Sequence, residues 1–107
     1  MQNKYQFKFT PLALSDINEA MTYISENLAN PAAAKNLYGN IEKTIEKIRV
    51  FPYAFADCSH YMISDKEIRH VRVGNYILIY EVIKSTETIH ILRFLYSMMD
   101  FSQIDIK

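Results

Sequence analysis

The chain has 107 residues, with 12 basic and 12 acidic side chains, so its formal net charge is zero. This length predicts one domain, residues 1–107, with a single core. The balanced charge excludes the strong positive field of many nucleic-acid-binding proteins. Cys58 is the only cysteine, which excludes an intramolecular disulfide and a cysteine-based metal cluster. Because we find no signal peptide and no apolar run of about 18 residues, we expect a cytoplasmic protein that does not enter a membrane.

The N-terminal part of the chain predicts a strand followed by a helix. Aromatic residues at positions 5, 7 and 9 alternate with polar ones, which is the period of a half-buried strand. Thr10 and Pro11 indicate a helix start, because a hydroxyl caps the first turn and proline is tolerated there. Asp16 lies early in this helix, where the helix dipole stabilises acids. An apolar stripe extends the helix to about residue 28 and consists of Leu14, Ile17, Met21, Ile24 and Leu28.

A second helix follows after a short connection. Asn30 and Pro31 repeat the same start signal. Phe51 ends the helix, because a residue that precedes proline is pushed out of the helical region. The apolar face of this helix consists of Ala34, Leu37, Ile41, Ile45 and Ile48. Two helices joined by so short a connection predict an antiparallel hairpin.

The C-terminal half predicts a loop and then a run of strands. Residues 52–65 have weak periodicity and indicate a loop. Three β-rich segments, 67–73, 76–84 and 87–96, are separated by short turns and predict an antiparallel meander. The fold class is therefore expected to be α+β, with an N-terminal strand, a helical hairpin and a three-stranded meander. We expect the helices to pack on one face of the sheet.

Four motifs follow one another on these elements. They are FTPLALSDI at the first helix, NPAAAKNLYGNIEKTIEKIRVFP along the second, VRVGNYILIYEV in the first hairpin of the meander, and ILRFLYSMMD at its end. In this order they resemble the RelE/ParE superfamily of bacterial toxins from type II toxin–antitoxin modules. The resemblance covers nearly the whole chain. It implies the RelE/ParE-like fold, no cofactor and a cognate antitoxin as partner.

The resemblance also indicates candidate catalytic residues. In relatives that cut mRNA on the ribosome, basic side chains hold the scissile phosphate and a histidine or tyrosine transfers protons. Arg72 and Tyr96 match such positions and are the catalytic candidates if the chain is a nuclease. However, Ile77 and the pair Met98-Met99 occupy positions that are often basic in relatives. An apolar side chain cannot supply the fixed positive charge that a cleaving site needs.

The same departure predicts a partner-binding surface. Methionine forms soft, adaptable apolar contacts, so Met98 and Met99, followed by Asp100, are candidates to bind a partner. Arg69 is a further partner-binding candidate, with a structural or solvated role as its alternative. The three histidines have no spacing typical of a metal site, so we expect no bound metal.

We therefore expect a ParE-like toxin that inhibits growth by binding a cellular target, with DNA gyrase as the candidate. Operator DNA would be contacted only through the antitoxin. Two alternatives stay open. One is a ribosome-dependent mRNA endoribonuclease in which Arg72 holds the phosphate, Tyr96 transfers protons and lysines such as Lys66 assist. The other is a non-toxic relative that only binds antitoxins.

Overall fold

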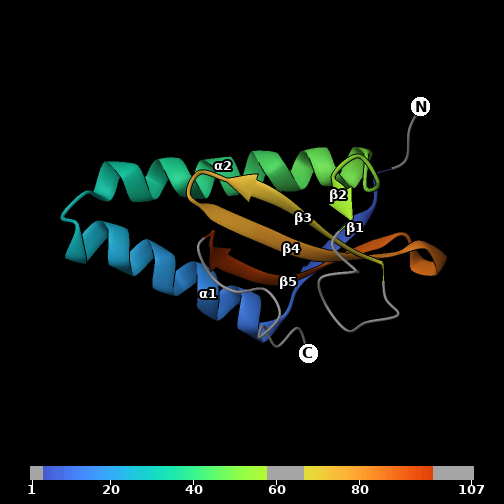
Figure 1. Cartoon of the computed structure of the whole chain (residues 1–107), viewed down its shortest axis with the longest axis horizontal. Helices are drawn as coiled ribbons and strands as arrows, with labels where there is room; N and C mark the ends of the chain where they lie inside the picture. Colours follow the sequence, from blue (N-terminus) through green and yellow to red (C-terminus); the bar gives the residue numbers. More distant parts are fainter. Residues whose placement is uncertain (1–3, 58–66, 98–107) are drawn as a thin grey trace.

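The computed structural model describes residues 4–57 and 67–97 (Figure 1). Five strands form one sheet in the order β1-β5-β4-β3-β2. Strands β3 (Ile68–Val73), β4 (Tyr76–Ile83) and β5 (Thr88–Tyr96) pair antiparallel, which confirms the predicted meander. Strand β1 (Gln6–Phe9) joins the edge of β5 in parallel, with Phe7 opposite Ile89. The β3–β4 turn needs Gly74, whose φ of +60° is costly for a side chain with a Cβ atom.

The two helices begin where the sequence predicts. The hydroxyl of Thr10 accepts the backbone N–H of Ala13 at 3.0 Å and caps α1 (Pro11–Thr22). The side-chain oxygen of Asn30 accepts the N–H of Ala33 at 3.1 Å and caps α2 (Pro31–Val50). Thr10 also donates to the carbonyl of Leu92 at 2.8 Å, so the first cap ties α1 to β5. Each cap therefore fixes the start of its helix, and the cap of α1 also fixes the position of that helix beside the sheet.

The first helix does not continue as an α-helix to residue 28. After Thr22 it widens into a π-helical turn, Tyr23–Asn27, in which the N–H of Leu28 reaches the carbonyl of Tyr23 at 3.0 Å. Ala29, with a φ of +49°, then turns the chain toward α2. A widened turn of this kind shifts the direction of the side chains that follow it. Periodicity alone predicted one uninterrupted stripe and missed this change.

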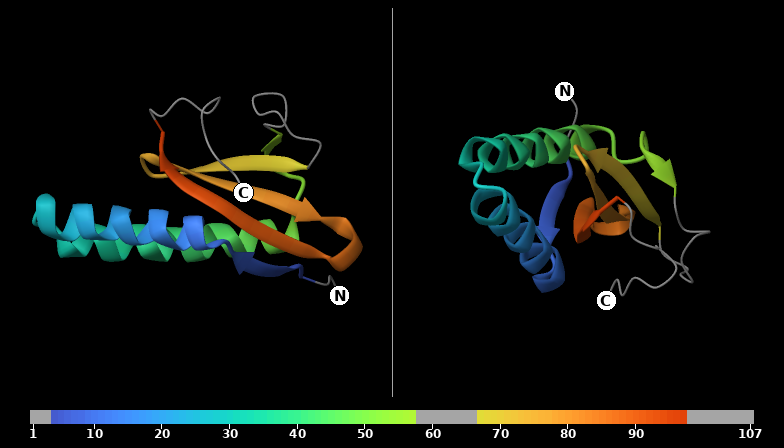
Figure 2. Two further views of the ribbon diagram at one scale, coloured as in Figure 1. Left: turned by 90° about the horizontal axis from the view of Figure 1, so that it is seen from below. Right: turned by 60° about the vertical axis from the view of Figure 1, so that its left-hand side comes forward.

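The helical hairpin packs on one face of the sheet, as the sequence predicts (Figure 2). All five residues of the predicted α2 face are buried in this core. For α1 the prediction is wrong at both ends of the stripe, because Leu14 and Leu28 are 54% and 55% exposed. Ile17 of the predicted stripe is buried, and the other two buried positions of α1 are Ala13 and Ala20. Two alanines allow α1 to approach its neighbours closely, and the two leucines remain at the surface.

Tyr80 lies at the centre of this core. It is fully buried on the face of β4 that it shares with Leu78 and Val82, and its hydroxyl donates to the carbonyl of Pro52 at 2.9 Å. Tyr76, at the start of the same face, is only partly buried against the core. This face of β4 is therefore covered at its centre and accessible at its beginning.

The other face of the sheet is also apolar. A second cluster of buried residues consists of Ile68, Ile77, Ile79, Leu92 and Leu95. Ile77 and Ile79 of this cluster alternate along β4 with residues of the main core, because successive side chains of a strand point to opposite faces. A bulge brings Leu92 onto this face, because Ile79 pairs with Arg93 while Tyr80 pairs with Ile91.

Part of the predicted loop is a strand. Residues Ala56–Asp57 form β2, with Ala56 opposite His70 and Asp57 opposite Arg69 of β3. The prediction of a loop over 52–65 is therefore wrong at these positions, and 58–66 lie outside the described residues. A strand of two residues is too short to show a periodic pattern, so β2 could not be predicted from the sequence. Among the described residues, no helix has the length and apolarity needed to cross a membrane.

The burial of His70 predicts a stability that depends on pH. Burial lowers the pKa of His70 below its ordinary value of 6.5. The unfolded chain therefore binds a proton at a higher pH than the folded chain does, and folding stability is lost as the pH falls through about 6.5. We expect the melting temperature to be a few °C lower at pH 5.5 than at pH 7.5, and His70→Gln to reduce this difference. Thermal unfolding at both pH values measures it. The matched control is His90→Gln on β5, and an equal effect of the two substitutions would contradict the assignment to His70.

Candidate functional site

The two catalytic candidates point to opposite faces of the sheet. Arg72 is exposed on β3, and its Nε donates to the carbonyl of Gly74 at 3.0 Å. Its neighbour Val73 is buried in the main core, so Arg72 points away from the helices. Tyr96, at the end of β5, lies on the helix side, where its ring is 5.9 Å from that of Tyr76. The described residues therefore do not bring Arg72 and Tyr96 into one site.

Tyr96 instead belongs to a concave surface with two further tyrosines. We call it the tyrosine hollow; it has a volume of about 750 Å³ and is lined by Tyr23, Ile24, Leu28, Ala33, Asn75, Tyr76 and Tyr96. The α1–α2 connection extends past the β3–β4 turn (Figure 1). The hollow is lined from the end of the first helix, the start of α2, the β3–β4 turn and the end of β5. Tyr23 and Tyr96 are each 50% exposed. A smaller depression next to it shares its three tyrosines and adds Asp16 and Glu19.

The rings in the tyrosine hollow are held in a fixed arrangement. Tyr76 stacks on Phe94 with ring centroids 4.9 Å apart, and it meets Tyr96 edge to face at 80°. Burial, and to a smaller extent the neighbouring Tyr23 and Tyr96, raise the pKa of Tyr76 above its usual 10.0. Its phenol is therefore neutral at pH 7 and can donate a hydrogen bond, but it is poorly suited to act as a general base.

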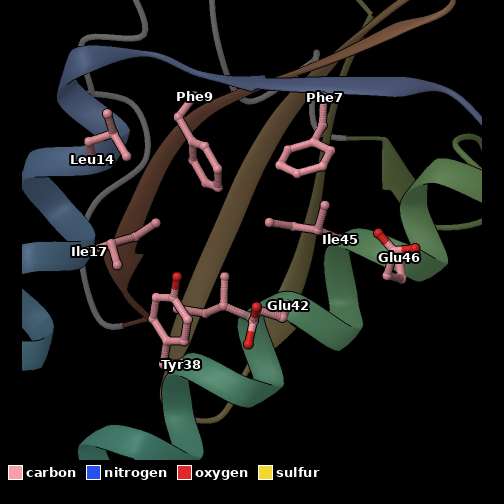
Figure 3. A pocket seen from close by; sticks show the side chains of 9 residues that line it. Phe7, Phe9, Leu14, Ile17, Tyr38, Glu42, Ile45 and Glu46 are labelled. Carbon is pink, nitrogen blue, oxygen red and sulfur yellow. The ribbon is translucent and has the colours of Figure 1, made fainter.

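A second concave surface opens between β1 and the two helices. We call it the hairpin groove; it has a volume of about 490 Å³ and is lined by Phe7, Phe9, Leu14, Ile17, Tyr38, Ile41, Glu42, Ile45 and Glu46. Figure 3 shows the side chains from β1 and α1 pointing across the groove toward those of α2. Phe7, Leu14 and Tyr38 are 38%, 54% and 52% exposed. So many large apolar side chains in one exposed groove are typical of a binding surface.

The rim of the hairpin groove is acidic. Glu42 and Glu46 line it from α2, and both are exposed. Glu46 accepts hydrogen bonds from Arg49 at 2.8 Å and Lys4 at 3.2 Å. The bond from Arg49, followed by that from Lys4, lowers the pKa of Glu46. The groove therefore combines an apolar floor with a carboxylate rim at neutral pH.

Arg69 is engaged within the chain. Its guanidinium donates to the carbonyls of Phe55 at 2.5 Å and Tyr53 at 3.2 Å, and it pairs with Glu67 at 2.9 Å. It also lies 5.3 Å from the centre of the Tyr53 ring. These contacts hold the segment before β2 against β3. Met98, Met99, Asp100 and Lys66 lie outside the described residues.

An ion pair between α1 and β5 positions the walls of the tyrosine hollow. Arg93 donates to both carboxylate oxygens of Asp16, at 2.7 and 3.1 Å. The backbone N–H of Phe94 donates to the same carboxylate at 3.0 Å. Asp16 is not in the first turn of α1, so its main role is this contact rather than the dipole interaction that the sequence predicted. Among residues 4–57 and 67–97, no three His, Cys, Asp or Glu side chains are arranged to hold a metal ion.

Known proteins resemble the chain in both sequence and fold. Residues 7–101 match the family model described as the ParE toxin of the type II toxin–antitoxin system, parDE. A solved structure described as the chromosomal ParDE TA system from P. aeruginosa is similar with a TM-score of 0.66 and 17% sequence identity. The alignment covers 87% of this chain and 96% of that one, and it confirms the expected α+β fold. No curated protein matches the chain.

Proposed function

Because the chain belongs to the ParE family of toxins from type II toxin–antitoxin systems, we propose that it inhibits growth by binding DNA gyrase. A cognate antitoxin neutralises it and carries the complex to operator DNA. The hairpin groove and the tyrosine hollow share no lining residue, so the chain offers separate surfaces to the antitoxin and to gyrase.

The observation that supports binding rather than RNA cleavage is the separation of the catalytic candidates. Arg72 and Tyr96 belong to opposite faces of the sheet. Ile77, at a position that is often basic in relatives, is 8% exposed within the second apolar cluster. Cleavage by the 2′-hydroxyl requires several positive groups around one phosphate. A net charge of zero also gives little attraction to ribosomal RNA.

The antitoxin is proposed to occupy the hairpin groove. A segment that folds on binding can insert apolar side chains at helical spacing between β1 and α2. Its basic residues would pair with Glu42 at the rim, because Glu46 is already paired with Arg49 and Lys4. Met98, Met99 and Asp100 are proposed to extend a partner-binding surface. Arg69 is proposed to support such a surface through the segment of Tyr53 and Phe55 that it holds.

The test measures whether DNA synthesis or protein synthesis stops first. Nascent DNA and nascent protein are pulse-labelled within minutes of inducing the chain alone, and purified chain is added to a gyrase supercoiling assay. We expect DNA labelling to fall before protein labelling and supercoiling to be inhibited. An early loss of protein synthesis would instead identify a ribosome-dependent nuclease. No effect on either would identify a relative that only binds antitoxins.

A substitution at Tyr96 separates the binding and nuclease functions further. Tyr96→Phe keeps the exposed ring and removes only the hydroxyl that a nuclease would use for proton transfer. We expect growth inhibition to change less than about twofold, whereas loss of a general acid–base group lowers a rate ~100-fold or more. Growth curves after induction, with protein levels matched by immunoblot, measure it. A loss of toxicity in Tyr96→Phe, with its melting temperature unchanged and with protein labelling falling first in the wild type, would support the nuclease.

A further inference from the structure

We propose that the tyrosine hollow binds an arginine side chain presented by the target protein. This proposal rests on the proposed function in one respect only, which is that the target is a protein. It adds the chemistry by which the target is recognised.

The shape of the tyrosine hollow fits a flat cationic group. The rings of Tyr76 and Tyr96 stand at 80° to each other and enclose a corner, and the stacking of Tyr76 on Phe94 holds one side of it in place. Tyr23 lines the hollow from the π-helical turn of the hairpin. A guanidinium group is planar and stacks on aromatic faces, and its five N–H donors can also reach phenol oxygens. A lysine ammonium group offers no flat face for stacking.

The charge around the hollow favours a cation over a phosphate. Among the described residues that line it and the depression next to it, the only charged ones are Asp16 and Glu19. Asp16 is paired with Arg93, whereas Glu19 is exposed and lines the depression next to the hollow. Tyrosine rings also stack on nucleobases, but nucleic-acid sites combine such rings with positive side chains along the backbone path. A carboxylate at the rim repels phosphate, so the lining indicates a protein partner.

The exposed residues of the hollow bury only about half of their surface within the described part of the chain. Tyr23, Leu28 and Tyr96 are all at least 50% exposed. Tyr23 and Leu28 come from the two ends of the π-helical turn, and Tyr96 comes from the end of β5. Their convergence is produced by the π-helical turn and by the hairpin tip that extends past the sheet. Large side chains that gather at one exposed, concave place are typical of a protein-binding surface, where tyrosine and arginine are the common anchors.

The experiment titrates the full chain with three small probes and follows the backbone and aromatic NMR signals. The probes are N-acetyl-arginine amide, its neutral isostere N-acetyl-citrulline amide, and an eight-residue thymidine oligonucleotide. We expect arginine to shift the signals of Tyr23, Tyr76 and Tyr96 and to bind at least ~3-fold more tightly than citrulline. Equal binding of arginine and citrulline would overturn the proposal. Stronger binding of the oligonucleotide at the same residues would identify a nucleic-acid surface instead.

Variants then test the individual groups. We expect Tyr96→Leu and Glu19→Gln each to weaken arginine binding ~2- to 5-fold. The matched control is Tyr38→Leu, which removes a tyrosine of similar exposure, 52%, from the hairpin groove and should leave arginine binding unchanged. Melting temperatures verify that each variant is folded. An equal loss in Tyr38→Leu would show that the arginine contacts are not confined to the hollow and would overturn the proposal.

Growth assays connect the hollow to the target. Tyr96→Leu should reduce growth inhibition and should leave antitoxin binding intact. Unchanged growth inhibition in a variant that no longer binds arginine would contradict the assignment to the target. If the wild-type chain stops protein synthesis rather than DNA synthesis, the proposed function fails, whereas the arginine titration still decides the chemistry of the hollow.

Discussion

Replacing Asp16 by alanine is expected to lower the free energy of unfolding by ~3–5 kcal/mol. The carboxylate receives two hydrogen bonds from Arg93 and one from the backbone N–H of Phe94. The side chains of Asp16 and Arg93 are only 11% and 16% exposed, so water replaces these contacts poorly. The substitution removes the carboxylate that neutralises a largely buried guanidinium. It also removes a link between α1 and β5 across 77 positions of the chain.

Thermal unfolding measures this effect. For a domain of this size, 1 kcal/mol corresponds to ~4–8 °C, so the melting temperature should fall by more than ~10 °C. Glu19→Ala is the matched control, because Glu19 is an exposed acid on the same helix and should cost ~0.5 kcal/mol or less. The double substitution Asp16→Ala with Arg93→Met should recover part of the loss, because the largely buried guanidinium is then removed together with the carboxylate that it pairs with. A similar cost for Asp16→Ala and Glu19→Ala would mean that the ion pair contributes little.

Local signals in the sequence predicted the two helix starts, the buried face of α2 and the meander. Thr10 and Asn30 cap helices through contacts to residues only three positions away, so their roles can be predicted from sequence alone. The apolar face of α2 is correct at every predicted position, because a helix of 20 residues repeats its period many times. The meander follows from three β-rich segments with turns between them.

Contacts between distant residues could not be predicted in the same way. The partner of Asp16 lies on β5, and nothing near Asp16 in the sequence distinguishes a partly buried ion pair from a favourable position in the helix dipole. The bulge at Leu92 changes which side chains of β5 face the helices. The two-residue strand β2 is defined only by its pairing with β3.

The candidate site was predicted in part. Arg72 and Tyr96 were both found through the family resemblance, but the strand register that directs them to opposite faces was not. Leu14 and Leu28 looked like core residues, because the exposed ends of an apolar stripe have the same spacing as its buried middle. These two wrong predictions lie in the hairpin groove and the tyrosine hollow, so each departure from the expected core coincides with a proposed binding surface.

Replacing Leu14 by glutamate is expected to abolish neutralisation by the antitoxin while the chain remains toxic. Leu14 is 54% exposed in the hairpin groove, so the fold tolerates a polar side chain there. A docked apolar segment would instead have to bury a new charge against a rim that already carries Glu42 and Glu46. At an interface anchor this costs at least ~2 kcal/mol, which weakens antitoxin binding ~30-fold or more. Binding of the purified antitoxin and growth with both proteins expressed measure it.

The matched control is Leu28→Glu, which introduces the same change at a leucine of nearly equal exposure, 55%, in the tyrosine hollow. It should leave antitoxin binding within about twofold of the wild type and should reduce growth inhibition. The two substitutions lie on one helical hairpin, so a general weakening of the hairpin would affect both activities in both variants. Opposite effects require two separate surfaces, because only then does each leucine contact one partner. If Leu14→Glu and Leu28→Glu lose the same activity, the groove and the hollow form one continuous interface, and the assignment of each to its own partner is wrong.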